Sequence, residues 1–329
     1  KEEINLFILT KLIFSLKLNY FDYLLKYIDY VNPKVVITSI DNNKDFYRIK
    51  KFKPNITTIF FQNGHRTGGN GDIFEILEKK NLTNFKKNYH VDLMCVFNRF
   101  TSDKYSKFIS GNTFLSGSLK NNNEKIYKKK YNRLVFISLF RPSREPFDRE
   151  NKLIKTISKF ASKNNLELYI LGKHLKKNDK FLENRYFSTI LKKGYKFIEN
   201  FKKRKTYKFL DESKIVVSPG STMGIESLGR KNKTAIIHTL PKNSIFKKTY
   251  WGYYTKREDN GFFWGNEISE KNIFRILNNL NKISDSQWKK KIKSFEYETC
   301  IYDYKNKRLK KKLLNLFENS KFNLKPYLK

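Results

Sequence analysis

The chain has 329 residues, of which 39% are hydrophobic and 16% aromatic, so it is long and apolar enough for two folded domains and is not a disordered protein. Its 69 Lys and Arg residues outnumber 31 Asp and Glu residues, which gives a formal net charge of +38. We interpret this charge first as a general compositional drift and second as attraction to an anionic membrane surface, and without any signature of an RNA- or DNA-binding module we expect no specific nucleic-acid partner.

The first part of the chain alternates helices with short apolar strands. We expect a helix from Asn5 to Asp29, strands at 34–40, 57–62, 92–97 and 112–116, and a helix at 102–109. Strands that alternate with helices indicate a parallel α/β sheet whose ligand sites lie at the carboxyl ends of its strands. A complete domain of this kind would have another strand or two before Lys34, and a missing N-terminal piece would explain the difference.

A polar, lysine-rich stretch at 121–130 has no apolar period, and we interpret it as a linker between two domains. A second series of alternating elements follows, with expected strands at 134–140, 166–171, 215–218 and 234–238 and helices at 150–164, 269–282 and 304–319. Residues 175–208 fit no single element. The predicted fold is therefore α/β, with two Rossmann-like domains whose parallel sheets face a central cleft.

Residues 214–238 contain the clearest candidate binding site. A buried strand and a Pro-Gly turn lead into a helix that we expect to begin at Ser221 or Thr222. Free N–H groups, the two hydroxyls and the helix dipole favour phosphate there, although the same hydroxyls also fit a plain helix cap. Gly224 would let the helix approach a ligand or the sheet. Glu226 is too far along for a capping box, and its carboxylate would accept hydrogen bonds from a ribose.

The turn after the strand at 57–62 is a second candidate site. This turn would bind either an acceptor substrate or an anion, through Asn63, Gly64 and Arg66. Arg66 would hold an anion by two parallel hydrogen bonds. The same residues also fit an ordinary exposed turn. His65 is the one histidine in a glycine-rich turn between a strand and a helix. It is therefore the best-placed general base for an acceptor hydroxyl.

Further charged residues follow other predicted strands. Asp41, at the carboxyl end of its strand, is the alternative base, while Arg141 and Lys173 would neutralise a leaving diphosphate or would be solvated surface. The histidines have no metal-ligand spacing, and no Asp-x-Asp motif stands at a cleft-facing strand end, so we expect no metal and no bound cofactor. The isolated Cys95 and Cys300 indicate no disulfide framework and fit a reducing cytoplasm.

Four stretches together resemble a group of bacterial surface-carbohydrate (O-antigen-type) biosynthesis proteins with a GT-B glycosyltransferase fold. These stretches are FQNGHR at 61–66, SGSLKNN at 116–122, STMGIE at 221–226 and NGFFW at 260–264. The resemblance implies a nucleotide-sugar donor as co-substrate and a cell-surface polysaccharide or lipid-linked glycan as acceptor. A weaker resemblance links the chain to the glycerophosphotransferases of teichoic-acid synthesis, in which the turn reads His-Gly where this chain has Gly64-His65.

On this interpretation residues 1–125 form an acceptor-side domain, 126–285 a nucleotide-sugar-binding domain and 286–329 a basic helical segment. We expect a cytoplasmic protein, with peripheral contact to the inner face of the plasma membrane as a further expectation. A CDP-glycerol-type phosphotransferase and a sugar-nucleotide epimerase are alternatives on the same fold. A non-catalytic protein that binds polyanions or membranes is the alternative of another class.

Overall fold

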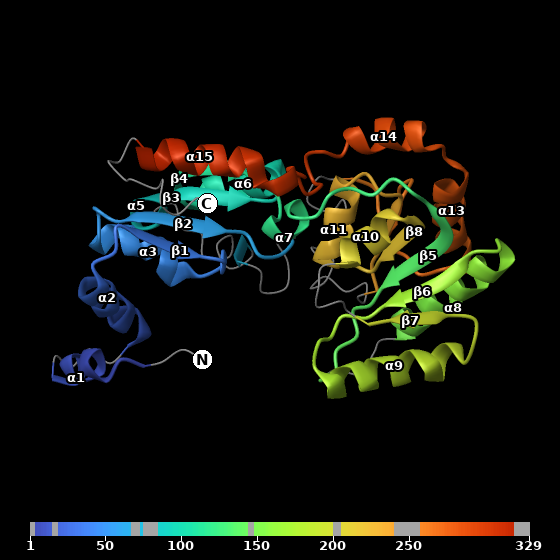
Figure 1. Cartoon of the computed structure of the whole chain (residues 1–329), viewed down its shortest axis with the longest axis horizontal. Helices are drawn as coiled ribbons and strands as arrows, with labels where there is room; N and C mark the ends of the chain where they lie inside the picture. Colours follow the sequence, from blue (N-terminus) through green and yellow to red (C-terminus); the bar gives the residue numbers. More distant parts are fainter. Residues whose placement is uncertain are drawn as a thin grey trace.

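The computed structural model describes residues 4–14, 19–66, 73–74, 85–143, 148–199, 205–239 and 257–318. Two separate parallel sheets form two lobes that lie side by side (Figure 1). We call the sheet built by residues 35–115 and its helices the first lobe, and the sheet built by residues 131–265 and its helices the second lobe. The predicted GT-B-like α/β fold is confirmed.

In the first lobe the strands follow one another in chain order across the sheet, β1-β2-β3-β4. The strands are β1 (Val35–Thr38), β2 (Thr57–Phe61), β3 (His90–Val96) and β4 (Ser110–Leu115). The helices are α1 (Leu6–Phe14), α2 (Tyr20–Val31), α3 (Lys44–Phe52), α5 (Phe85–Asn88), α6 (Arg99–Phe108) and α7 (Leu119–Asn122). The helix expected from Asn5 to Asp29 is thus two helices, and the side chain of Asn19 caps the second.

In the second lobe the strand order is β10-β9-β8-β5-β6-β7. The strands are β5 (Tyr131–Ile137), β6 (Glu167–Leu171), β7 (Lys196–Ile198), β8 (Ser213–Ser218), β9 (Thr234–Ile237) and β10 (Trp264–Gly265). The helices are α8 (Asp148–Lys163), α9 (Lys177–Leu191), α10 (Lys205–Asp211), α11 (Thr222–Gly229), α13 (Glu270–Lys282) and α14 (Asp285–Lys293). Because the chain order reverses between β5 and β8, ligands are expected in the crevice beyond the carboxyl ends of these two strands.

The end of the chain returns to the first lobe. A short 3-10 turn, η2 (Tyr304–Asn306), leads into α15 (Lys307–Glu318), which lies along the first sheet (Figure 1). Leu309 and Phe317 of α15 join a buried cluster with Ile59 and Leu93 of that sheet. The sequence grouped α15 with the rest of 286–329, whereas its apolar face makes it part of the first lobe.

Glycines let the returning chain pass between the lobes. A Cβ atom at Gly117, whose φ is +68°, would lie 1.9 Å from the carbonyl oxygen of Ile301. A Cβ atom at Gly229 would lie 1.8 Å from the carbonyl oxygen of Cys300. Both contacts involve backbone, so neither position accepts a side chain without movement of the connection.

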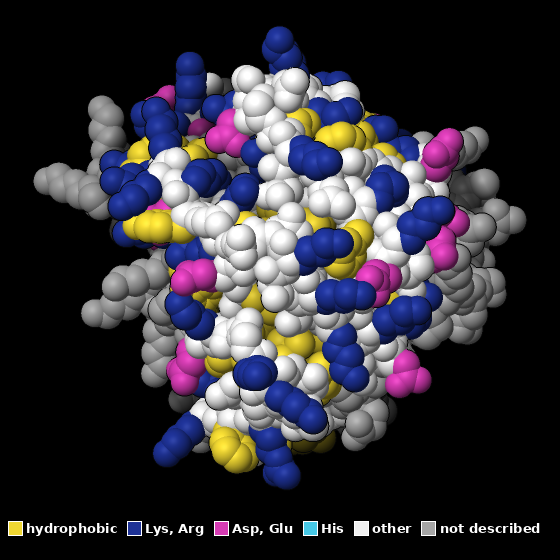
Figure 2. Space-filling model, turned by 90° about the vertical axis from the view of Figure 1, so that its right-hand side faces the viewer, with side chains coloured by type: hydrophobic (Ala, Val, Ile, Leu, Met, Phe, Trp, Pro, Cys, Tyr) yellow, Lys and Arg dark blue, Asp and Glu magenta, His cyan; other side chains and the backbone are white. Residues whose placement is uncertain are grey.

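On the one face that Figure 2 shows, the positive charge is spread out and does not form a single patch. On the outer face of the second lobe, Lys and Arg side chains are scattered and Asp and Glu lie between them (Figure 2). This distribution favours the interpretation of the charge as a general compositional drift over a single nucleic-acid-binding patch on that face. None of the described helices combines the length and apolar character needed to cross a bilayer.

Candidate functional site

The predicted site residues of the two lobes meet at one place. The turn after β2 and the start of α11 are in direct contact, because the backbone N–H of His65 donates a hydrogen bond of 3.0 Å to Oγ1 of Thr222. These residues are 157 positions apart in the chain. The structure therefore brings together the candidate acceptor turn and the candidate phosphate-binding helix.

The start of α11 is built as a capped helix. Ser221 is the N-cap, and its Oγ accepts a hydrogen bond of 3.3 Å from the N–H of Met223. Gly220 before it has φ +111°, and a Cβ atom there would lie 2.9 Å from Cε1 of His238. The N–H of Thr222, the first residue of the helix, has no acceptor among the described residues. Ser221 thus caps the helix, and the Thr222 N–H remains for an anion.

Gly224 serves the packing of α11 on the sheet. A Cβ atom at this position would lie 2.3 Å from Oγ and 2.4 Å from Cβ of Ser218, at the end of β8. Of the two alternatives predicted for Gly224, contact with a ligand or with the sheet, the sheet contact is the one observed.

Glu226 lies in a buried network that joins the lobes. It is 5% exposed, and its Oε2 accepts a hydrogen bond of 2.9 Å from the hydroxyl of Tyr207. Ser118, the N-cap of α7 in the first lobe, is also close enough to Glu226 to influence its pKa. Burial raises the pKa of Glu226, while the neighbouring hydroxyls of Ser118 and Tyr207 act in the opposite direction. Each carboxylate oxygen can accept another hydrogen bond, so a ribose hydroxyl would join or displace these partners.

Tyr207 and Ser118 were not predicted as site residues. Ser118 belongs to the 116–122 stretch that carried the resemblance, so a signal for its place in the site was present. Tyr207 falls in the stretch 175–208, which had no clear period and resolves here into α9, β7 and part of α10.

Asp41 is the centre of a buried hydrogen-bond network. It is 0% exposed, and it accepts hydrogen bonds from the Asn63 N–H (3.1 Å), the Tyr105 hydroxyl (2.6 Å) and the Arg66 guanidinium (2.5 and 2.9 Å). The carboxylate is fully buried and both of its oxygens already accept hydrogen bonds, so a substrate hydroxyl has no route to it. The geometry therefore argues against Asp41 as a base and makes it the support of the turn that contains His65.

Arg66 and Asn63 belong to the same hydrogen-bond network, which holds the turn in place. Besides Asp41, the guanidinium of Arg66 contacts Oδ1 of Asn63 at 3.0 Å. The side chain of Gln62 adds a bond of 2.7 Å to the carbonyl of Gly64. Arg66 was predicted to bind an anion; its observed contacts hold the turn, and its charge stays next to His65.

His65 is half-buried and lies close to His238 and Arg66. Burial, followed by the charges of His238 and Arg66, lowers the pKa of His65 to about 3. Burial, followed by the charge of Arg149, lowers the pKa of His238 to about 4. Both imidazoles are therefore neutral at pH 7. The buried Nδ1 of His65 has no hydrogen-bond partner among the described residues, so it is open to a ligand hydroxyl or a water molecule.

Arg141 and Lys173 follow the neighbouring strands β5 and β6 and are exposed. Loss of solvent around the Lys173 amine, and then the nearby charge of Arg141, lower the pKa of Lys173. The buried carboxylate of Glu183 fixes the loop by accepting a hydrogen bond of 3.0 Å from the backbone N–H of Lys173. Two repelling cations at strand ends form a favourable place for an anion.

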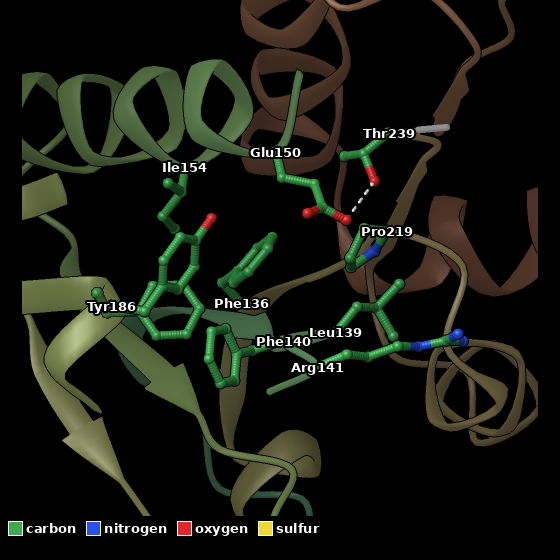
Figure 3. A pocket seen from close by; sticks show the side chains of 10 residues that line it. Phe136, Leu139, Phe140, Arg141, Glu150, Ile154, Tyr186, Pro219 and Thr239 are labelled. Atoms are coloured by element: carbon green, nitrogen blue, oxygen red, sulfur yellow. Dashed lines mark hydrogen bonds between the residues drawn. The ribbon is translucent and has the colours of Figure 1, made fainter. Parts of the chain in front are cut away.

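A small cavity lies at the crossover point between β5 and β8 (Figure 3). Rings of Phe136, Phe140 and Tyr186 lie on one side of it, and Glu150 and Thr239 lie on the other. The rings of Phe140 and Tyr186 are stacked, with centroids 5.1 Å apart. The cavity has a volume of about 20 Å³, enough for one water molecule. The sequence did not single out these residues, because they come from β5, the loop after it, α8, α9 and the loop after β9.

Among the described residues, no three His, Cys, Asp or Glu side chains gather in a group that could hold a metal ion. The expectation of metal-independent chemistry remains a prediction.

A family model described as "putative O-antigen biosynthesis protein" matches residues 59–317. No curated protein matches the chain. Among solved structures, the chain is similar to a "putative UDP-N-acetylglucosamine 2-epimerase" from Listeria monocytogenes, with a TM-score of 0.56, 14% identity, and coverage of 91% of this chain and 78% of that chain.

Two further solved structures are similar over the same extent. For the UDP-GlcNAc 2-epimerase of Methanocaldococcus jannaschii in complex with UDP-GlcNAc and UDP, the TM-score is 0.54 at 10% identity, with 90% of this chain and 79% of that chain covered. For the Neisseria meningitidis enzyme bound to UDP-GlcNAc, the TM-score is 0.53 at 13% identity, with coverage of 90% and 80%. At these identities the similarity shows the fold.

Proposed function

This chain belongs to the O-antigen biosynthesis protein family whose model it matches over residues 59–317, and on that premise we propose that it is a glycosyltransferase acting in surface-polysaccharide synthesis. It would move a sugar from a nucleotide-sugar donor to a cell-surface polysaccharide or lipid-linked glycan. Family membership confirms the resemblance seen in the sequence. The observation that carries the proposal is the contact between His65 of the first lobe and Thr222 of the second.

The donor would lie along the carboxyl ends of β8, β5 and β6. Its diphosphate would accept hydrogen bonds from the Thr222 N–H and the hydroxyls at the start of α11, with the charges of Arg141 and Lys173 nearby. Its ribose would reach Glu226, one turn further along the helix from Thr222. The nucleobase is too large for the small cavity of Figure 3, but the half-buried rings of Phe140 and Tyr186 beside it would offer a stacking surface.

In the proposed reaction an acceptor hydroxyl oxygen forms a bond to the anomeric carbon of the donor sugar. The bond from that carbon to the diphosphate oxygen breaks, and the leaving nucleoside diphosphate takes the electron pair. The start of α11 and the two cations stabilise the negative charge that develops on it. The acceptor proton goes to a base, for which His65 is the candidate.

Because the pKa of His65 is low, its role as the base depends on whether the donor is bound. An imidazole with a pKa of about 3 is neutral at pH 7 but accepts a proton weakly. A donor diphosphate bound at Thr222 would bring negative charge beside His65 and raise its pKa. His65 would therefore become an effective base only when the donor is in place.

A nucleotide-sugar 2-epimerase is the second candidate function. The solved structures with TM-scores of 0.53 to 0.56 carry the name of that enzyme, so the same fold serves that chemistry. An epimerase would convert the nucleotide sugar with no acceptor present. Product analysis by NMR after incubation with the nucleotide sugar alone distinguishes the two activities.

Isothermal titration with UDP-, GDP-, CMP- and dTDP-sugars and with CDP-glycerol tests the donor site. We expect one nucleotide sugar to bind, and we expect Glu226→Gln and Thr222→Val each to weaken it about tenfold. Glu258→Gln, which changes an exposed carboxylate in the second lobe, is the matched control. Absence of binding by every compound, or equal affinity in all four proteins, would overturn the donor-site assignment. A preference for CDP-glycerol would replace glycosyl transfer with glycerophosphate transfer.

We also propose peripheral contact with an anionic membrane through α1 and α2. The apolar side chains Leu6, Phe7 and Phe14 of α1 are 72%, 54% and 89% exposed, and Tyr30 of α2 is 61% exposed. Exposed apolar and aromatic side chains on a strongly basic chain suit the surface of an anionic bilayer. Sedimentation with phosphatidylglycerol vesicles tests this contact. Equal sedimentation of the wild type and of the Phe7→Ser/Phe14→Ser variant would refute it.

A further inference from the structure

A second hollow lies where the chain passes between the lobes, away from the cavity of Figure 3. Its volume is about 530 Å³, within the range of small-molecule sites. Its walls come from both lobes: the ends of β4 and α11, the starts of α6 and α15, the linker and the connection after α14. The charged and aromatic side chains of the lining are Arg99, Lys231, Glu296, Arg308, Tyr297 and Tyr302.

The charges that line this hollow are unbalanced. Lys231 is paired with Glu296, with 3.2 Å between Nζ and Oε1. The guanidinium groups of Arg99 and Arg308 have neither a hydrogen-bond nor an ion-pair partner among the described residues. The backbone N–H of Arg308 donates a hydrogen bond of 2.8 Å to the carboxylate of Asp303, while its guanidinium lies over the ring of Phe114, 5.8 Å from the centroid. Two cations in one hollow therefore lack an anion.

The tyrosines of the hollow are held in place by their hydroxyls. Tyr297 donates a hydrogen bond of 3.0 Å to Asp103, and Tyr302 donates one of 2.7 Å to the carbonyl of Glu124. Their rings are therefore positioned before any ligand binds, so binding would cost little side-chain conformational entropy.

We propose that this hollow binds a small molecule bearing a phosphate or pyrophosphate group, held by Arg99 and Arg308. Guanidinium groups pair with phosphate through two parallel hydrogen bonds, which makes arginine the residue best suited to this group. The same group occurs on soluble metabolites and on lipid-linked carriers. Leu115 and Ile126, also in the lining, would contact an apolar chain if the ligand carries one.

Binding here would act on the helix of the proposed donor site. The hollow reaches Gly229, the last residue of α11, while Thr222 begins the same helix. An eight-residue helix rises about 1.5 Å per residue, so the two places lie roughly 10 Å apart along it. Because Arg99 and Arg308 belong to the first lobe and Lys231 to the second, a bound anion would bridge the lobes.

Titration calorimetry with inorganic pyrophosphate tests the site on the whole chain. We expect Arg99→Gln and Arg308→Gln each to weaken binding about tenfold, and Ile126→Trp to block the hollow without changing charge. The positions are on the surface, so the variants should fold, which circular dichroism checks. Lys310→Gln/Lys311→Gln removes two exposed charges of α15 outside the hollow and controls for general attraction of anions.

The outcomes separate the hollow from the proposed donor site. Thr222→Val should leave pyrophosphate binding at the hollow within twofold of the wild type, whatever it does to nucleotide-sugar binding. Geranyl pyrophosphate binding more tightly than inorganic pyrophosphate would identify a lipid-linked ligand, and equal affinity would identify a soluble one. The proposal is overturned if the wild type does not bind pyrophosphate, if the arginine and Ile126→Trp variants bind it unchanged, or if the lysine control loses as much affinity.

Discussion

Replacing Arg230 by methionine tests how the two lobes are joined. Arg230 follows α11 and is 2% exposed. Its Nε donates to Asp211 at 2.8 Å, and the rest of the guanidinium bonds to Asp211 and to carbonyl oxygens of Asn121, Glu124 and Lys125 at the start of the linker. One side chain of the second lobe thus fixes the segment that leaves the first.

The expected loss follows from what the variant leaves behind. Arg230→Met leaves the fully buried carboxylate of Asp211 with two hydrogen bonds among the described residues, from the Asn232 side chain at 2.9 Å and the Tyr127 N–H at 3.1 Å, and with the charge of Lys130 nearby. Breaking a buried ion pair from one side costs about 3–5 kcal/mol. At roughly 2–4 °C per kcal/mol, the melting temperature should fall by about 6–20 °C.

Differential scanning calorimetry measures this effect against two comparisons. Lys231→Met breaks the exposed pair with Glu296, so it should cost less than about 1 kcal/mol. The double variant Arg230→Met/Asp211→Asn removes the stranded charge and should recover part of the loss. A fall no larger than that of Lys231→Met, or a double variant as unstable as the single, would refute the reasoning.

Three further predictions concern other parts of the junction. Gly229→Ala should destabilise the protein by several kcal/mol in urea unfolding, because the new Cβ would lie 1.8 Å from the carbonyl oxygen of Cys300. The control Gly194→Ala should cost about 1–2 kcal/mol, because Gly194 has φ +80° but no atom within 4 Å of the new Cβ. The lowered pKa values of His65 and His238 mean that the unfolded state binds more protons below pH 6.5. The free energy of unfolding should therefore fall between pH 6.5 and 4.5, by up to about 1.4 kcal/mol per pH unit for each histidine. The melting temperature should fall with it, and should fall less in His65→Gln/His238→Gln. Asp41→Asn should lower the melting temperature as strongly as Arg230→Met, whereas a purely catalytic Asp41 would leave it unchanged.

The strands were the most predictable part of the fold. Runs such as LVFI in β5 and IVV in β8 are apolar throughout because parallel strands are buried on both faces. The placement of α15 was not predictable in the same way. Its apolar period shows that one face is buried, but not which of two sheets buries it.

The site was predictable in position and less so in role. Strand ends in a parallel α/β fold converge, so Thr222 and the turn after β2 were found from local sequence. Asp41 also stands at a strand end, but its partners Arg66 and Tyr105 are 25 and 64 residues away. A buried support and an exposed base have the same local sequence, and only the long-range contacts separate them.

Helix α11 connects the features on which the proposed function and the proposed anion site depend. Its first residue contacts the His65 turn, Glu226 in its middle lies near Ser118 of the first lobe, and its last residue lies against the chain that returns to that lobe. A donor that takes over the Thr222 hydroxyl would therefore loosen the hydrogen bond from the His65 N–H, which joins the lobes. An anion in the hollow beyond Gly229 would tighten the junction at the other end. By thermodynamic linkage, if the anion changes the affinity of the protein for the donor by some factor, the donor must change the affinity for the anion by the same factor.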